Sequence, residues 1–123
     1  MEIIEKGKIP GIDEVSFLKG SNGLYAFFVD DDEDSYTTRF IYESYKVMSD
    51  CLLRICERKS DGTKKYGIIS SHGNNPLLSC VFDKIKPYDG NVLLAYIGEN
   101  KYFINAWGEV FSSKIYEMRN SSK

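Results

Sequence analysis

Apolar and polar residues alternate along this chain in short runs that predict β-strands joined by turns. Residues 12–17 alternate apolar and polar, which is the period of a half-buried strand. Residues 24–29 are continuously apolar, which favours a central strand covered on both faces. Asn22-Gly23 lies between these runs and is a strong hairpin signal, because both residues tolerate positive φ. No window of eleven residues keeps helical spacing without a glycine or a strand-like alternation, so the pattern predicts an all-β chain.

The clearest pattern of strands and turns runs from Lys65 to Val110. It contains, in order, the strand Lys65-Tyr66-Gly67-Ile68-Ile69, a turn at 73–76, the block Phe82-Asp83-Lys84-Ile85, an Asp89-Gly90 turn and an apolar strand at 92–97. Another strand begins at Asn100. One unit therefore ends and the next begins within this stretch.

Two motifs of this stretch recur elsewhere in the chain. Tyr66-Gly67-Ile68-Ile69 matches residues 25–28, about 41 residues earlier, and residues 101–104, about 35–36 residues later, where the alignment is ambiguous by one residue. A second motif, an acidic residue next to a large apolar one, occurs at 12–15, 42–45, 82–85 and 115–118. Periods of this length are typical of repeat proteins, in which each unit buries its apolar face on a neighbour.

These repeats predict one all-β domain over residues 1–123. The expected units are about 9–34, 35–74 and 75–118, followed by a frayed tail at 119–123. We expect three WG-like repeats that form a strongly twisted antiparallel meander, closed into a barrel or a two-sheet sandwich.

The motifs resemble the WG-repeat family, also called KWG repeats, over about residues 9–118. Repeats of that family typically read Gly-Lys-Trp-Gly-Tyr-Ile-Asp, then a turn glycine, a Tyr-Asp-Glu-Ile block and an Asn-Gly-Leu-Ala strand. Tyr66 stands where the family usually has tryptophan, and the single tryptophan, Trp107, falls in a turn. The resemblance implies β-strand repeats in a binding or structural protein. Small stand-alone proteins of this kind also occur in bacterial toxin–immunity gene clusters.

Composition excludes several functional classes. The net charge of -2 argues against a nucleic-acid partner and against an anionic membrane surface. No apolar run reaches the length of a signal peptide or a membrane span. Three cysteines, an odd number without a secretion signal, fit free thiols, so we expect a cytoplasmic protein.

Negative charge is concentrated in the run Asp30, Asp31, Asp32, Glu33 and Asp34. Without these five residues the chain would hold 16 basic and 13 acidic residues. The run is either a solvated loop that protects a strand end or a patch that steers a basic partner. In the second case Tyr36, next to the run, would supply a rigid aromatic anchor.

Candidate catalytic and metal sites have weaker support. His72, Cys80 and Asp83 could form a nucleophilic site only if the fold brings His72 and Cys80 into hydrogen-bond contact. Cys51 and Cys56 are an odd number of residues apart on a predicted strand, so they point to opposite faces and do not suit one metal ion. Asp30, Asp32 and Asp34 begin like a calcium loop, but its later glycine and glutamate are missing. We expect no enzyme activity, no cofactor and no metal.

The sequence thus favours a non-catalytic, cytoplasmic protein-binding module. In its most concrete form it is an immunity-type inhibitor that neutralises a basic, nuclease-like toxin through the acidic run and Tyr36. One alternative is a structural or scaffold repeat protein without a single target. The other is a small-ligand binder or enzyme with a cleft near His72 and Cys80.

Overall fold

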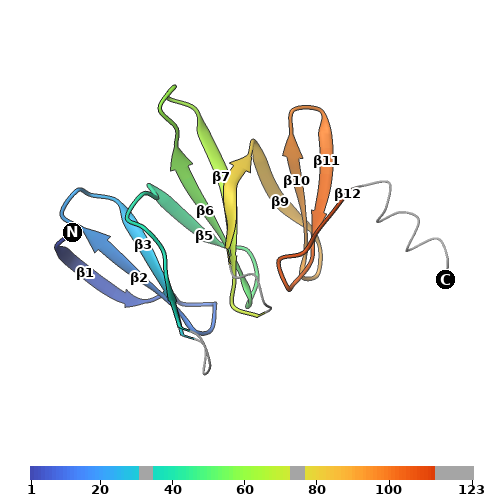
Figure 1. Cartoon of the computed structure of the whole chain (residues 1–123). Coiled ribbons are helices and arrows are strands. Elements are labelled where there is room, and N and C mark those ends of the chain that lie inside the picture. Colours follow the sequence, from blue (N-terminus) through green and yellow to red (C-terminus); the bar gives the residue numbers. More distant parts are fainter. Residues whose placement is uncertain (31–34, 73–76, 113–123) are drawn as a thin grey trace.

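A computed structural model describes residues 1–30, 35–72 and 77–112, and this part of the chain is all-β, as predicted. Its twelve strands form three antiparallel sheets of four (Figure 1). The first sheet holds β1 (Ile3–Lys8), β2 (Val15–Gly20), β3 (Tyr25–Val29) and β4 (Tyr36–Thr37). The middle sheet holds β5 (Ser44–Val47), β6 (Leu52–Arg58), β7 (Lys64–Ser70) and β8 (Leu77–Phe82). The last sheet holds β9 (Lys84–Asp89), β10 (Val92–Ile97), β11 (Asn100–Ile104) and β12 (Val110–Ser112).

Each sheet is a meander in which strands adjacent in sequence are also adjacent in space. Figure 1 shows the three sheets side by side, with the middle sheet between the other two. No closed barrel forms within the described residues, so the predicted barrel or two-sheet sandwich is not confirmed. An isolated bridge between Tyr25 and Tyr42 links the first two sheets through backbone hydrogen bonds of 2.7 and 3.2 Å.

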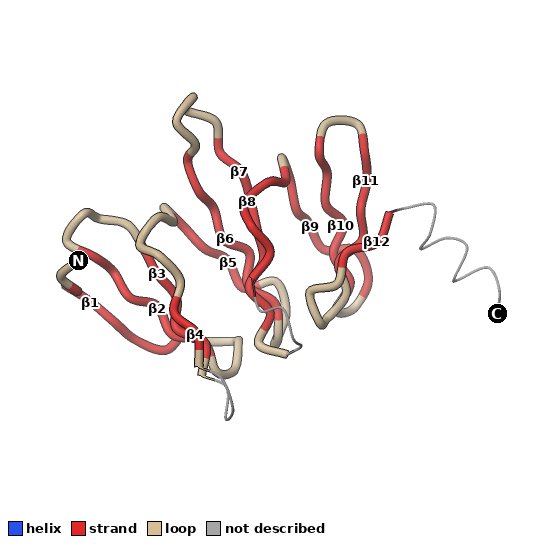
Figure 2. Tube along the Cα trace, viewed as in Figure 1, coloured by secondary structure: helices blue, strands red, loops and turns tan. Residues whose placement is uncertain are grey.

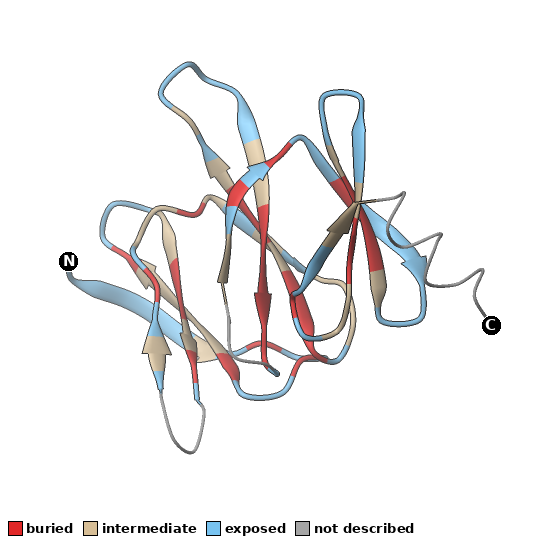
Figure 3. Cartoon of the chain, turned by 45° about the vertical axis from the view of Figure 1, so that its right-hand side comes forward, coloured by how far each residue is buried: buried red, intermediate tan, exposed pale blue. Residues whose placement is uncertain are grey.

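The middle sheet contributes to two hydrophobic cores because it is apolar on both faces. Side chains alternate between the faces of a strand. Leu53, Ile55 and Ile69 pack with the first sheet, against residues such as Val15 and Phe27. On the opposite face, Leu52 and Ile68 belong to a second core with Ile85, Leu93 and Ile104 of the last sheet. Figure 3 shows these buried segments running through the centres of the sheets.

Strand pairing removes the ambiguity in the third copy of the repeat. Leu53 faces Ile69 in the middle sheet, and Leu93 faces Ile104 in the last one. Arg54–Ile68 and Leu94–Phe103 are the next pairs along the same ladders. The spacing between β7 and β11 is therefore 35 residues, and Lys101, not Tyr102, is the counterpart of Tyr66.

The sheets do not begin and end where the predicted repeats do. The described strands span 3–37, 44–82 and 84–112, whereas the sequence suggested 9–34, 35–74 and 75–118. The predicted tail at 119–123 lies outside the described residues. The offset arises because residues 12–14 form the connection before β2 and not the start of a strand. The Ile12 side chain is buried although it lies in this loop, so the apolar and polar residues around it have the spacing expected of a strand.

Candidate functional site

The two ends of the sheets differ in charge. Because each sheet is a meander, the connections after β1, β3, β5, β7, β9 and β11 lie at one end, and the others lie at the opposite end (Figure 2). The described residues of the first group include no lysine or arginine, although Lys8 ends β1 beside them, as Asp89 ends β9. Exposed carboxylates there are Asp13, Glu14, Asp30, Asp50, Asp89 and Glu109. We call these six residues the acidic end.

Hydrogen bonds hold the connections of the acidic end side by side. The Asp30 N–H donates to the Glu14 carbonyl (2.8 Å), and the Asp13 N–H donates to the Asp50 carbonyl (3.4 Å). Further along, the Ser71 N–H donates to the Cys51 carbonyl (2.9 Å), and Ser70 Oγ donates to the Ala106 carbonyl (3.0 Å). Consecutive contacts thus join all three sheets, from Asp30 to the turn that carries Trp107.

Glu14 has an unusual backbone conformation at this end. Its φ is 65°, and no other non-glycine residue in the described part of the chain has a positive φ. Such a conformation costs on the order of 1 kcal/mol for a residue with a Cβ. The carbonyl of Glu14 accepts the Asp30 N–H, so this turn fixes the point at which the acidic run begins.

The structure describes two of the six residues predicted to bind a partner. Asp30 is exposed, whereas Asp31, Asp32, Glu33 and Asp34 lie outside the described residues. Tyr36 is half-buried opposite Val29 and packs against the first core, so much of its ring already has a structural contact. Asp13, Glu14 and Asp50 join Asp30 only in three dimensions. Every second connection of a meander lies at the same end of the sheet. The predicted order of strands and turns could therefore have indicated that these residues lie at one end.

Trp107 is an exposed aromatic side chain in the turn after β11, next to Glu109. Trp107 is 58% exposed, although tryptophan is usually well buried. The Asn105 side chain fixes this turn, since its Oδ1 accepts the Trp107 N–H (3.0 Å) and the Glu109 N–H (2.9 Å). Gly108 supplies the positive φ of 76°. An aromatic surface is therefore presented on a well-defined turn at the acidic end.

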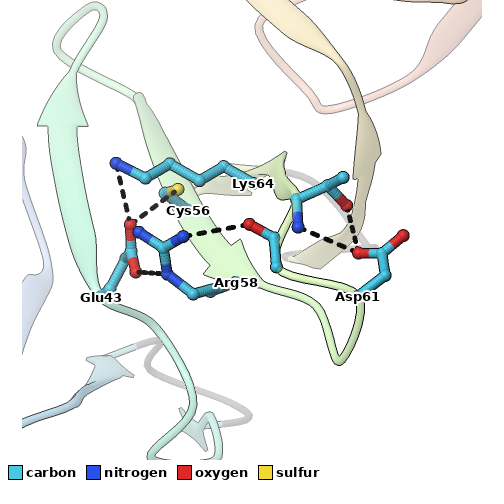
Figure 4. Close-up of polar contacts among 7 residues, drawn as sticks. Glu43, Cys56, Arg58, Asp61 and Lys64 are labelled. Carbon is cyan, nitrogen blue, oxygen red and sulfur yellow. Dashed lines mark hydrogen bonds and ion pairs between the residues drawn. The ribbon is translucent and has the colours of Figure 1, made fainter.

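At the opposite end, acidic and basic side chains are paired. Figure 4 shows Glu43 between Arg58 (Nε to Oε2, 3.1 Å) and Lys64 (Nζ to Oε1, 3.2 Å). Hydrogen bonding to Lys64, with a further contribution from Arg58, lowers the pKa of Glu43. Lys65 likewise contacts Asp83. Part of the charge at this end is therefore compensated by ion pairs, whereas no ion pair is present among the described residues of the acidic end.

His72 and Cys80 are not brought together. Cys80 lies beside Gly67 in the middle sheet, whereas His72 follows β7, five residues further along. The three strand steps from Gly67 to Ser70 alone span about 10 Å. Cys80 is 1% exposed, and burial raises the pKa of its thiol to about 12, which disfavours the nucleophilic thiolate. Cys51 and Cys56 are also buried free thiols.

Other kinds of site are not seen in the described part of the chain. Residues 1–30, 35–72 and 77–112 include no group of three or more His, Cys, Asp or Glu side chains that could hold a metal ion. The same ranges contain no helix long and apolar enough to cross a membrane. No protein-family model, curated protein or solved structure matches the chain.

Proposed function

We propose that this chain is a non-catalytic protein-binding module that engages a basic partner through its acidic end. The observation that carries the proposal is the segregation of charge. All three sheets contribute carboxylates to one end, and the described residues of the connections there include no lysine or arginine. The predicted acidic run, Asp30 to Asp34, begins at this end.

The physical advantage of such a surface is rapid and selective association. A concentration of one charge sign attracts an oppositely charged protein over a Debye length and raises the association rate. Trp107 adds an aromatic side chain of the type that dominates binding energy at interfaces. Carboxylates on a defined surface can occupy the places where a nucleic-acid enzyme binds phosphates.

The most concrete form of the proposal is a cytoplasmic, immunity-type inhibitor of a basic, nuclease-like toxin. Its support is the acidic end together with the resemblance of the sequence motifs at about 9–118 to WG repeats. The three unpaired cysteines agree with a reducing compartment. A scaffold repeat protein without a single target remains the second candidate, since the three similar sheets supply a regular framework for it.

Charge neutralisation tests the proposal. We would identify any basic protein encoded by a neighbouring gene and measure its binding by calorimetry at two salt concentrations. The Asp13→Asn/Asp30→Asn variant is expected to lose at least about tenfold in affinity and to show a weaker salt dependence. Trp107→Ala is expected to weaken binding to a similar degree.

The matched control is Glu2→Gln/Glu99→Gln, which makes the same change in net charge at exposed sites away from the acidic end. It should bind like the original chain. Equal losses in the two double variants would show that only net charge matters, and the acidic end would no longer be the binding site.

A further inference from the structure

A groove follows β1 on the face of the first sheet that carries Lys6 and Lys8, and its far part borders the first core through Ile9, Ile12 and Val15. Three clefts lie along it, with volumes of about 340, 470 and 400 Å³. The first contains Ile3 to Lys6, the second contains Lys6 and Lys8, and the third continues from Lys8 to Asp30. Neighbouring clefts thus share a lysine, and together they run the length of a six-residue strand, about 20 Å.

The floor of this groove is apolar and its sides are basic. Leu18 and Phe28, both half-buried, line the central cleft. Lys6 is paired across the ladder with Leu18, and Lys8 with Ser16, so both lysines project on the face that carries this floor. Neither lysine makes an ion pair within the described residues. The central cleft therefore presents two uncompensated ammonium groups beside an apolar surface.

The backbone of β1 offers hydrogen-bonding groups without a strand partner at its open edge, on the side of β1 away from this floor. β1 is an edge strand that pairs only with β2 among the described strands. The Ile9 N–H donates to the Val15 carbonyl (3.2 Å), so odd-numbered residues of this segment direct their backbone groups toward β2. Lys6 and Lys8, at even positions, therefore direct their N–H and C=O groups toward the open edge.

We propose that β1 is a docking edge for an extended acidic segment of another protein, which adds to the first sheet as a fifth strand. Residues opposite Lys6 and Lys8 lie two apart in the incoming strand, with side chains on the lysine face. Carboxylates at these two positions complete both charge pairs. Lysines on an edge strand disfavour pairing with other strands. A segment with two carboxylates opposite them is the exception, so these lysines make the edge selective for acidic segments.

The ends of the groove define the rest of the segment. Glu14 and Asp30 line the cleft beyond Lys8, which suits a basic residue of the partner. Ile3 and Ile4, 46% and 60% exposed, lie at the other end and suit an apolar residue. An antiparallel strand enters from the Asp30 end, so its sequence reads basic, acidic, acidic and apolar at alternate positions. This inference rests on β1 and shares only Glu14 and Asp30 with the acidic end, so failure of the proposed function would not overturn it.

A labelled peptide, acetyl-Arg-Thr-Glu-Thr-Glu-Thr-Val-amide, tests the proposal by fluorescence anisotropy with the whole chain. Saturable binding is expected, with affinity at least about tenfold higher than for the peptide in which Arg and Glu are exchanged. The Lys6→Glu/Lys8→Glu variant is expected to reverse this preference. Both lysines are exposed, so the variant should keep the native circular dichroism spectrum.

Lys84 and Lys86 provide a matched control, because they have the same spacing on β9, the edge strand of the last sheet. β9 contains Pro87, which has no N–H to donate, so Lys84→Glu/Lys86→Glu should leave peptide binding unchanged. A loss equal to that of the β1 variant would overturn the assignment to β1.

Backbone methylation separates strand addition from simple charge attraction. Methylating the amides of the two Glu residues, which would face β1, is expected to abolish binding, whereas methylating the three Thr amides should leave it. Equal affinity of the two methylated peptides would overturn strand addition. Concentration-dependent dimerisation that excludes the peptide and is lost in Lys6→Glu/Lys8→Glu would instead identify a second copy as the occupant, and would also overturn the proposal.

Discussion

At the scale of single residues, Gly67 shows why one position of the repeated strand motif is small. A Cβ built on Gly67 would lie 2.3 Å from the Leu78 carbonyl oxygen and 3.1 Å from the Cys80 nitrogen. Both atoms belong to the backbone of β8, whose pairing with β7 shifts register next to Gly67. The absent side chain therefore allows the two strands to approach closely, and the sequence pattern alone could not show which strand that would be.

Gly67→Ala is accordingly expected to destabilise the chain by about 1–3 kcal/mol, the usual cost of forcing extra atoms into a packed region. Urea unfolding measures this change in the free energy of unfolding. Gly7→Ala is the comparison, because a Cβ there would meet only the ring of Phe17, at 3.2 Å, and a ring can shift. A loss in Gly67→Ala no greater than in Gly7→Ala would contradict the steric explanation.

At the scale of elements, the second sequence motif places an acidic residue where it can hold the tip of a hairpin. Glu43 binds Arg58 and Lys64 from the ends of β6 and β7. Asp83 takes the corresponding place in the last sheet, where its Oδ2 accepts the Gly98 N–H (2.7 Å) in the β10–β11 turn. The sequence motif also includes the block at 12–15. Asp13, however, lies at the opposite end of its sheet, where its N–H donates to the Asp50 carbonyl.

Asp83 should therefore make stability depend on pH. The Gly98 N–H and then Lys65 lower the pKa of its carboxyl from the ordinary 3.8. A lowered folded-state pKa stabilises the fold above the unfolded pKa, and the contribution is lost as the pH falls through the lowered value. The melting temperature of the original chain should thus exceed that of Asp83→Asn at pH 7, and the difference should shrink below about pH 4.

The measurement is a series of melting curves between pH 7 and pH 2.5. Lys65→Gln serves as a control, because it removes the cation but keeps the Gly98 hydrogen bond, and should show an intermediate effect. A constant difference between the original chain and Asp83→Asn over the whole range would rule out a contribution from the Asp83 charge.

Local patterns predicted the turns better than the strand limits. Asn22-Gly23 and Asp89-Gly90 each contain a glycine with positive φ, 83° and 56° respectively. This agreement is expected, because turn chemistry depends on neighbouring residues. The aromatic residues spread through 36–47 favour a single strand, but only 36–37 and 44–47 are strands, because the chain crosses between sheets there. A crossing of this kind depends on distant partners and leaves no local signal.

At the scale of the whole molecule, the candidate surfaces follow from the order of the sheets. Asp13, Asp50 and Trp107 are far apart in sequence and come to one end only because each sheet is a meander with its connections alternating. The acidic run was visible in the sequence because its residues are consecutive. The rest of the acidic end was not, because it depends on three-dimensional stacking.

The same stacking predicts that the three sheets unfold together. Loss of the last sheet would expose Leu52, Ile68 and Phe82 of the middle sheet, which are at most 4% exposed. Exposing each such side chain costs about 1.5–3 kcal/mol, and a domain has only about 5–15 kcal/mol of total stability. The middle sheet could not keep its other face packed on the first sheet after such a loss.

We therefore expect the whole molecule to be destabilised both by Leu93→Ala, in the second core, and by Leu53→Ala, in the first. Each should lower the free energy of unfolding by about 2–5 kcal/mol. Hydrogen exchange should then report equally reduced protection in β3 and β10 for both variants, although each substitution lies in only one core. If Leu93→Ala lowered protection in β10 and β11 but left β3 unchanged, the last sheet would unfold on its own. The molecule would then behave as a one-dimensional array of units, and partner binding at the acidic end would not need all three sheets to be folded.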